Sequence, residues 1–246
     1  MNLKAIGCKV LLRETCSFVA QSEHTIDLEF FGFALHDDPA AMRVEVQKRI
    51  DAAEGEGYDA ILLVAGLCGH GSAGLKARSI PLVIPRVDDC IVLLMGSRER
   101  YDADHGANPG SYYLTPGWLE RSDGEEKGLG EEARRRIRLQ YVERFGEENA
   151  DYLMSVLHSW EGSYSRACLI DTGVVTKGRR ARCRRQARRI AESYGWRSEE
   201  LRGDTHLIRD LLEGSWPEGE FLVVPPGASI QPSNDGRVVT IGEIDA

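Results

Sequence analysis

Short apolar runs separated by amphipathic stretches dominate the first half of the chain. The runs are Lys4–Cys8, Ala60–Ala65 and Ile80–Ile84. Apolar runs of roughly four to eight residues, bounded by glycine or proline, are typical of strands buried on both faces of a parallel sheet. Each of the three runs therefore predicts an inner strand.

A helix signal lies between the first two runs. Asp38 is a good N-cap, and Pro39 suits the first helical position. Met42, Val46 and Ile50 then recur at helical spacing. A further helix is expected after the third run, where Asp88 could cap a segment that carries Cys90 in its first turn.

The last third of the chain repeats the alternation of strand and helix. The expected elements are strand 167–170, helix 178–194, a short strand near 196–201, helix 204–212 and strand 220–224. Between the two halves, residues 101–130 are rich in glycine and proline, and they also carry Tyr112, Tyr113 and Trp118. This composition predicts a long ordered loop or lid, followed by helices over 131–145 and 147–160.

These patterns predict an α/β fold with two Rossmann-like three-layer lobes, mostly parallel sheets and a ligand site at the C-terminal strand edge. The N-terminal lobe is expected over residues 1–105. The aromatic loop and connecting helices are expected over 106–162, and a smaller C-terminal lobe over 163–246.

Composition narrows the class of protein. The 246 residues carry a formal net charge of −8, which argues against a general nucleic-acid binder. No apolar stretch approaches the roughly 20 residues needed to cross a bilayer, and the N-terminus lacks the pattern of a signal peptide. We expect a cytoplasmic protein, in which the six cysteines are free, metal-bound or catalytic.

Three of those cysteines follow predicted strands. Cys8 ends the first run, Cys68 follows the second and Cys90 follows the third. Because the carboxyl ends of parallel strands share one edge, we expect the three thiols to meet there as ligands of an iron–sulfur cluster (4Fe-4S) or of zinc. The alternative for each is a small buried residue. Three thiolates leave one metal position open for a substrate.

Further candidates flank these cysteines. Gly66, Gly69 and Gly71 surround Cys68 and would let the backbone approach a cofactor. His70 could ligate the metal, carry a proton or hydrogen-bond the glycine loop. Arg86 could bind an anion. We expect the position of Cys90 at a helix N-terminus to lower the pKa of its thiol.

Other features carry less chemistry. Cys168 lies in an apolar strand, and Cys183 lies on the apolar stripe of its helix. That helix has eight cations over 177–189, which could grip a phosphate but are typical of a solvated face. The turn Asp171-Thr-Gly173 resembles a weak phosphate-binding turn.

Several segments together resemble one family over nearly the whole chain. They are Ile6–Leu11, Gly66–Gly71, Pro85–Ile91, Gly96-Ser97 with Tyr101, Tyr112–Trp118 and Pro225–Gly227. The family is the uncharacterised domain of unknown function 1638. The resemblance implies no established activity, although it points to anaerobic one-carbon or sulfur metabolism beside corrinoid-dependent methyl transfer.

Three functional hypotheses follow. The first is a metal or iron–sulfur enzyme that acts on a small thiol, sulfur or methyl-donor substrate, with His70 as proton carrier, Arg86 as anion anchor and 112–118 as cover. The second is a non-catalytic accessory protein that binds a small ligand or serves a corrinoid or methyltransferase system. The third is a metal-free enzyme with Cys90 as nucleophile.

Overall fold

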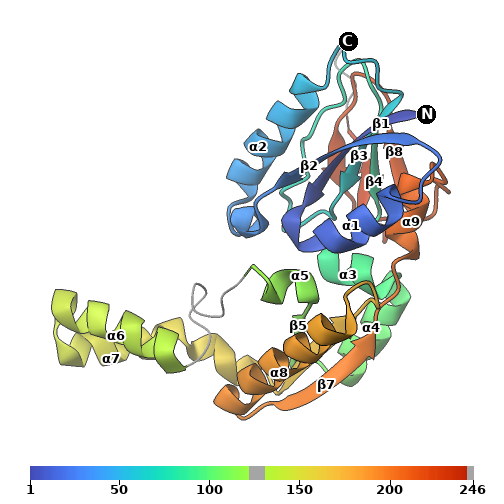
Figure 1. Cartoon of the computed structure of the whole chain (residues 1–246). Helices are drawn as coiled ribbons and strands as arrows, with labels where there is room; N and C mark the ends of the chain where they lie inside the picture. Colours follow the sequence, from blue (N-terminus) through green and yellow to red (C-terminus); the bar gives the residue numbers. More distant parts are fainter. Residues whose placement is uncertain (122–130, 243–246) are drawn as a thin grey trace. The chain divides into compact units, whose positions relative to one another are not determined.

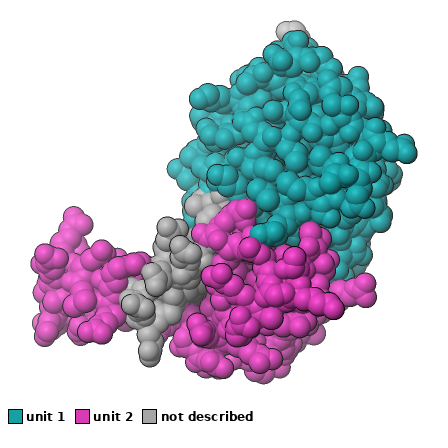
Figure 2. Space-filling model, viewed as in Figure 1, with its two compact units in different colours: residues 1–101, 203–246 teal, residues 102–202 magenta. Residues whose placement is uncertain are grey.

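The computed structural model describes residues 1–121 and 131–242. They form two compact units, residues 1–101 with 203–246 (unit 1) and residues 102–202 (unit 2) (Figure 2). Helix α4 (Arg98–Ala107) crosses the boundary between them. The chain is therefore a mixed α/β protein in which the second unit is inserted into the first.

Unit 1 is built on one five-stranded sheet with the order β2-β1-β3-β4-β8. Its strands are β1 (Asn2–Cys8), β2 (Thr25–Phe31), β3 (Ala60–Val64), β4 (Leu82–Pro85) and β8 (Phe221–Val224). The first four are parallel, and β8 is antiparallel to β4. A separate ribbon joins β9 (Ile230–Pro232) to β10 (Val239–Ile241). All five residues of β3 are buried, as an inner strand requires.

Helices cover both faces of this sheet (Figure 1). One face packs against α2 (Pro39–Ala52), and the other against α1 (Leu12–Val19) and α9 (His206–Leu212). The start of α2 is as predicted, because Asp38 accepts a hydrogen bond from the Ala41 amide and Pro39 is the first helical residue. The predicted core residues Met42, Val46 and Ile50 are buried. The short helix α3 (Cys90–Met95) follows β4, and the 3-10 turns η1 (Lys9–Leu11) and η2 (Phe33–Asp37) follow β1 and β2.

Unit 2 contains a three-stranded parallel sheet with the order β5-β6-β7. The strands are β5 (Ser111–Leu114), β6 (Arg166–Asp171) and β7 (Arg197–Arg202). The helices are α5 (Pro116–Leu119), α6 (Glu131–Phe145), α7 (Glu147–Leu157) and α8 (Lys177–Tyr194), with the 3-10 turn η3 (Ser159–Ser163). Helix α8 packs on the sheet through Cys183, Ala187 and Ala191, so the expected burial of Cys183 is confirmed.

The residues of the predicted C-terminal lobe, 163–246, are divided between the two units. Strand β8 pairs with β4, residue Leu82 opposite Val224, so residues 203–246 complete the sheet of unit 1. The boundaries 1–105, 106–162 and 163–246 therefore differ from those of the structure. The reason is a strand pairing between distant segments, and the apolar pattern of β8 alone does not specify its partner.

The predicted aromatic loop is also different. Tyr112 and Tyr113 lie in strand β5, and Trp118 lies in α5. The Tyr112 ring contacts Trp118, Trp160, Tyr164 and Trp196 at centroid distances of 5.2 to 6.2 Å. The predicted loop over 112–118 is therefore wrong, because this segment forms β5 and α5, and Tyr112 and Trp118 pack against the core of unit 2. The rest of the predicted loop, 122–130, lies outside the described residues.

Candidate functional site

The strand order of unit 1 brings the three selected cysteines to the same edge. Cys8 is the last residue of β1, Cys68 follows β3 by four residues, and Cys90 follows β4 by five. Strand β2 lies beside β1 on one side and β3 lies beside β1 on the other, so the strand order reverses at β1. The carboxyl edge at such a reversal is where open α/β sheets place their ligands.

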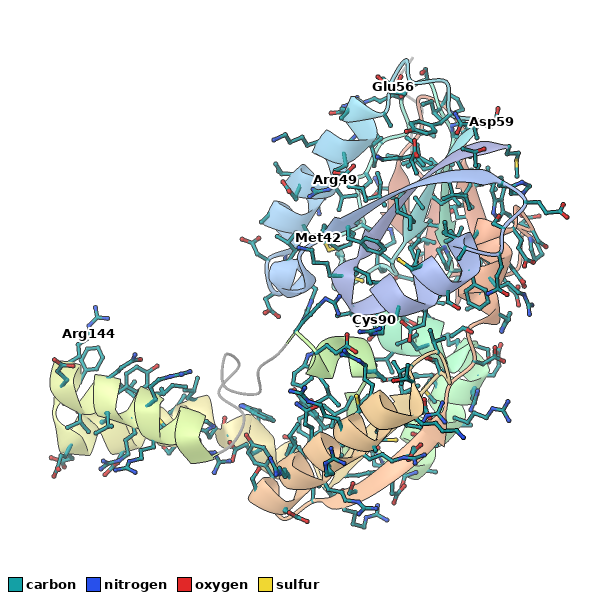
Figure 3. The ribbon with its side chains drawn as sticks, in the orientation of Figure 1. Met42, Arg49, Glu56, Asp59, Cys90 and Arg144 are labelled. Atoms are coloured by element: carbon teal, nitrogen blue, oxygen red, sulfur yellow. The ribbon has the colours of Figure 1, made fainter. Side chains whose placement is uncertain are left out.

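The three thiols share one environment. Cys8 belongs to the hydrophobic cluster on the α2 face, and Cys68 and Cys90 pack against that cluster. They are near enough to interact, since Cys8 raises the pKa of Cys68, and both Cys8 and Cys68 raise the pKa of Cys90. Figure 3 shows Cys90 at the end of unit 1 where α3 begins. Three thiols that are distant in sequence thus meet at one edge of the sheet.

Their spacing is wider than that of ligands around one ion. The three sulfur atoms are not all within 4.8 Å of one another. Tetrahedral zinc with Zn–S bonds of about 2.3 Å holds its thiolates about 4 Å apart. The thiols would have to move closer to bind zinc. A four-iron cluster takes each thiolate on a different iron and suits a wider set.

Burial governs the protonation of these thiols. It raises the pKa of Cys68 to about 12. It also raises the pKa of Cys90 well above the ordinary value, and the Asp89 carboxylate adds to this shift. The expectation that the helix N-terminus would lower the pKa of Cys90 was wrong, because desolvation and Asp89 outweigh the contribution of a helix of six residues.

Asp89 is the N-cap of α3. Its Oδ1 accepts hydrogen bonds from the amides of Ile91 and Val92, at 2.8 and 3.1 Å. The predicted cap was Asp88, one residue earlier. Burial raises the pKa of the Asp89 carboxyl group, while those two amides and His36 lower it. A carboxyl group with a raised pKa therefore lies next to Cys90.

The loop that carries Cys68 has an unusual backbone. Cys68, Gly69 and His70 have φ values of 49°, 60° and 71°. The left-handed region costs a non-glycine residue roughly 1–2 kcal/mol. Hydrogen bonds hold the loop in place, from the Cys68 amide to Asp88 (2.7 Å) and from the Ser72 hydroxyl to Gly66 (2.8 Å). Backbone strain of this kind concentrates at functional sites.

The three glycines of the loop are glycine for different structural reasons. A Cβ on Gly66 would lie 2.8 Å from the Val87 oxygen and the Asp89 nitrogen, so Gly66 permits close packing of two loops. Gly71 faces the Met42 sulfur in the same way. Only Gly69 of the three combines a positive φ with open space around a Cβ. It is the glycine that a cofactor could approach.

The predicted polar partners lie in different settings. His70 is exposed, and its carbonyl accepts a hydrogen bond from Arg43. The Arg86 Nε donates to the carbonyls of Glu218 (2.8 Å) and Phe221 (3.1 Å), and its Nη1 donates to Val239. Burial lowers the pKa of Arg86. Arg86 therefore fastens the C-terminal segment to β4, and fewer of its donors are left for an anion.

The other three cysteines lie elsewhere. Cys16 is exposed on α1, and Cys168 and Cys183 are buried in unit 2. The Cys168 sulfur accepts a hydrogen bond from Arg166 at 3.1 Å. Their place outside the candidate site remains a prediction, and the burial expected of Cys168 and Cys183 is observed.

A second polar group was missed. Among the described residues, His206, Asp210 and Glu220 offer three ligand atoms within 4.8 Å of one another. His206 and Asp210 are four residues apart on α9, a signal that was readable, whereas Glu220 comes from the distant approach to β8. Asp210 already accepts hydrogen bonds from Arg209, so a metal ion would compete with that guanidinium.

Unit 2 has a polar cavity at its own carboxyl edge. About 470 Å³ in volume, it is lined by Asp171, Thr172, Gly173, Arg180, Glu200 and Arg202. Three arginines of the basic helix α8 are paired here or nearby: Arg179 with Glu120, Arg180 with Asp171, and Arg184 with Glu200. These ion pairs fit the prediction of a solvated and balanced helix face.

With the site described, comparison with known proteins adds one result. A family model described as protein of unknown function (DUF1638) matches residues 30–212. The chain belongs to this DUF1638 family. No curated protein and no solved structure matches it. The DUF1638 match covers Cys68 and Cys90, while Cys8 lies before it. No described helix is long and apolar enough to span a membrane.

Proposed function

We propose that this DUF1638 protein holds an iron–sulfur cluster at Cys8, Cys68 and Cys90 and uses it to bind a small substrate. The observation that carries the proposal is the meeting of one buried thiol, Cys8, and two partly buried thiols, Cys68 and Cys90, at the edge where the strand order reverses. Thiolate is the soft ligand that iron–sulfur centres and zinc select. At least one pair of these sulfurs is more than 4.8 Å apart, which suits a cluster better than a single zinc ion.

Ionisation of these thiols would require a nearby cation. Desolvation, Asp89 and the neighbouring thiols all oppose a negative charge on Cys90. A metal centre would reverse that balance, because its positive charge deprotonates the thiols that coordinate it. The same property counts against a metal-free cysteine nucleophile, which needs a lowered pKa.

The residues around the cysteines suggest how a substrate would be bound and protonated. Three thiolate ligands leave one iron open, which would supply a Lewis acid for a thiol, a sulfur atom or a methyl donor. His70, exposed on the strained Cys68 loop, would carry a proton to or from the substrate. Gly69 leaves space above the loop. Arg86 would contribute to anion binding only through donors not held by the C-terminal segment.

The test is a metal and sulfide analysis of the full chain after anaerobic purification and reconstitution with iron and sulfide. The proposal predicts iron and sulfide in equal amounts, an absorption band of the cluster, and a spectral change when a small thiol is added. Zinc without sulfide would replace the cluster by a single-ion centre. Protein that holds neither metal would contradict the proposal.

The accessory-protein hypothesis makes a different prediction. A chain that delivers or senses a corrinoid would keep its ligand affinity after Cys68→Ala. The cluster proposal predicts that Cys68→Ala loses both metal and thiol binding. A free corrinoid is added to the unaltered chain and to the Cys68→Ala variant, and absorption spectroscopy of the two mixtures separates these outcomes.

A further inference from the structure

Helices α6 and α7 form a hairpin that lacks a core of its own. Of its described side chains, only Ala150 is buried. The two helices pack against each other and lie apart from the strands of unit 2 in Figure 1. Helices of 15 and 11 residues are marginal by themselves in water, and tertiary packing of an apolar face normally stabilises them.

The hairpin also exposes much apolar surface. Of the nine most exposed large hydrophobic side chains among the described residues, five lie on these two helices. They are Leu139, Phe145, Tyr152, Val156 and Leu157. Tyr152 and Val156 are four residues apart and therefore share one side of α7, with 69% and 55% of their surfaces exposed. A concentration of this kind marks an interaction surface.

Charge identifies the occupant of that surface. Helix α6 has five arginines and three glutamates, a net positive charge, whereas α7 has Glu147, Glu148 and Asp151 and no lysine or arginine. One pair, Arg138 with Asp151, already joins the two helices at 2.7 Å. In a twofold dimer, α6 of one copy would face α7 of the other, so a basic helix would meet an acidic helix twice. The hairpin is thus complementary to itself.

We propose that two copies of the chain associate through their α6–α7 hairpins and form a four-helix bundle. Such a bundle buries apolar side chains between antiparallel helix pairs. It would cover Tyr152 and Val156, and it would set the arginines of α6 against Glu147 and Glu148 of the second copy. The inference concerns only this hairpin and is independent of the cysteine site.

The first test is the mass of the full chain in solution. Sedimentation or light scattering is expected to give twice the 27.3 kDa of one chain. Tyr152→Glu with Val156→Glu should weaken the dimer about 100-fold or more. Val44→Glu is the matched control, because Val44 is 71% exposed on α2, outside the hairpin, and its replacement should leave the dimer intact. Circular dichroism verifies that each variant keeps its helices.

A charge exchange tests the pairing itself. Reversing α6 (Arg135→Glu with Arg144→Glu) or α7 (Glu147→Arg with Glu148→Arg) should weaken each homodimer. An equal mixture of the two variants should form a heterodimer, because both of its helix contacts become complementary again. A monomeric unaltered chain, or a dimer that survives the Tyr152 and Val156 changes, would overturn the proposal. A mixture that stays monomeric would overturn the proposed α6–α7 pairing.

Discussion

The two units bury ionisable groups in opposite ways. In unit 2, the fully buried Arg166 binds Asp104 through two nitrogens at 3.1 Å, with Glu199 at 2.8 Å, and the Cys168 sulfur accepts from the same guanidinium. In unit 1, the acidic and thiol groups around Cys90 oppose its ionisation. The buried charge of Arg166 is compensated by its ion-pair partners, so the folded unit needs no further ligand there. The thiols near Cys90 are held in their neutral, protonated form, which is stable in an apolar surrounding without any partner charge.

The backbones differ in the same direction. Strand β6, which carries Arg166 and Cys168, pairs with β7 along its whole length and with β5 from Arg166 to Leu169. The loop after β3 instead holds Cys68, Gly69 and His70 in left-handed conformations. Strand β6 thus has regular backbone, whereas the Cys68 loop has backbone strain of the kind that concentrates at functional sites.

The largest effect is expected from breaking the paired charge of unit 2. Arg166→Met removes the partner of Asp104, whose pKa burial raises but Arg166 and Tyr113 lower by a larger amount. The free energy of unfolding should fall by about 3–5 kcal/mol. Urea unfolding followed by tryptophan fluorescence measures it, with exposed Arg197→Met as control. A decrease in the free energy of unfolding no larger than that of the control would contradict a stabilising role for this ion pair.

In unit 1, Gly66→Ala should destabilise the contact between the Cys68 loop and the segment before Cys90. The new Cβ would lie 2.8 Å from backbone atoms of Val87 and Asp89. Forced overpacking of this kind costs about 1–3 kcal/mol. Gly32→Ala is the control, because nothing lies within 4 Å of its Cβ. Equal unfolding curves for the two variants would contradict the close approach.

The pH dependence of stability should report the burial of the Cys68 thiol. Burial raises the pKa of Cys68 from 9.0 to about 12 in the folded chain. Between these values the unfolded chain loses the proton and the folded chain keeps it, so the metal-free protein loses stability as the pH rises. Cys68→Ala should make this decline shallower in urea titrations at about pH 8 and about pH 10. An unchanged slope would mean that the thiol titrates normally.

The smallest effect concerns the strain of the loop. His70→Gly should raise the free energy of unfolding by about 1 kcal/mol, because glycine adopts a φ of 71° without a Cβ penalty. His70→Ala removes the same imidazole but keeps the Cβ, and it should give no gain. Calorimetry of both variants tests the prediction. Equal melting temperatures would indicate that the loop is not strained.

The sequence predicted local elements well and long-range pairings poorly. The start and buried face of α2 and helices α6, α7 and α8 agree with the structure within a few residues, because caps and apolar spacing are local signals. Strand β2 was missed, although Thr25–Phe31 alternates polar and apolar residues. The antiparallel pairing of β8 with β4 depends on two segments more than 130 residues apart.

The candidate site shows the same division. The positions of Cys8, Cys68 and Cys90 after three inner strands predicted a shared edge, and that edge exists. The pKa of Cys90 was not predictable, because it depends on burial and on Asp89 more than on the helix N-terminus. Tyr112 was assigned to a lid because glycine and proline flank it, but four other rings enclose it.

The most direct test of the central claim is the iron and sulfide content of six single cysteine-to-alanine variants, each reconstituted anaerobically beside the unaltered chain. The cluster proposal predicts large losses for Cys8→Ala, Cys68→Ala and Cys90→Ala, and unchanged content for the exposed Cys16→Ala. Cys168→Ala and Cys183→Ala should alter only the stability of unit 2. Full iron content in any of the first three variants, or an equal loss in Cys16→Ala, would contradict the claim that these three thiols form one metal centre.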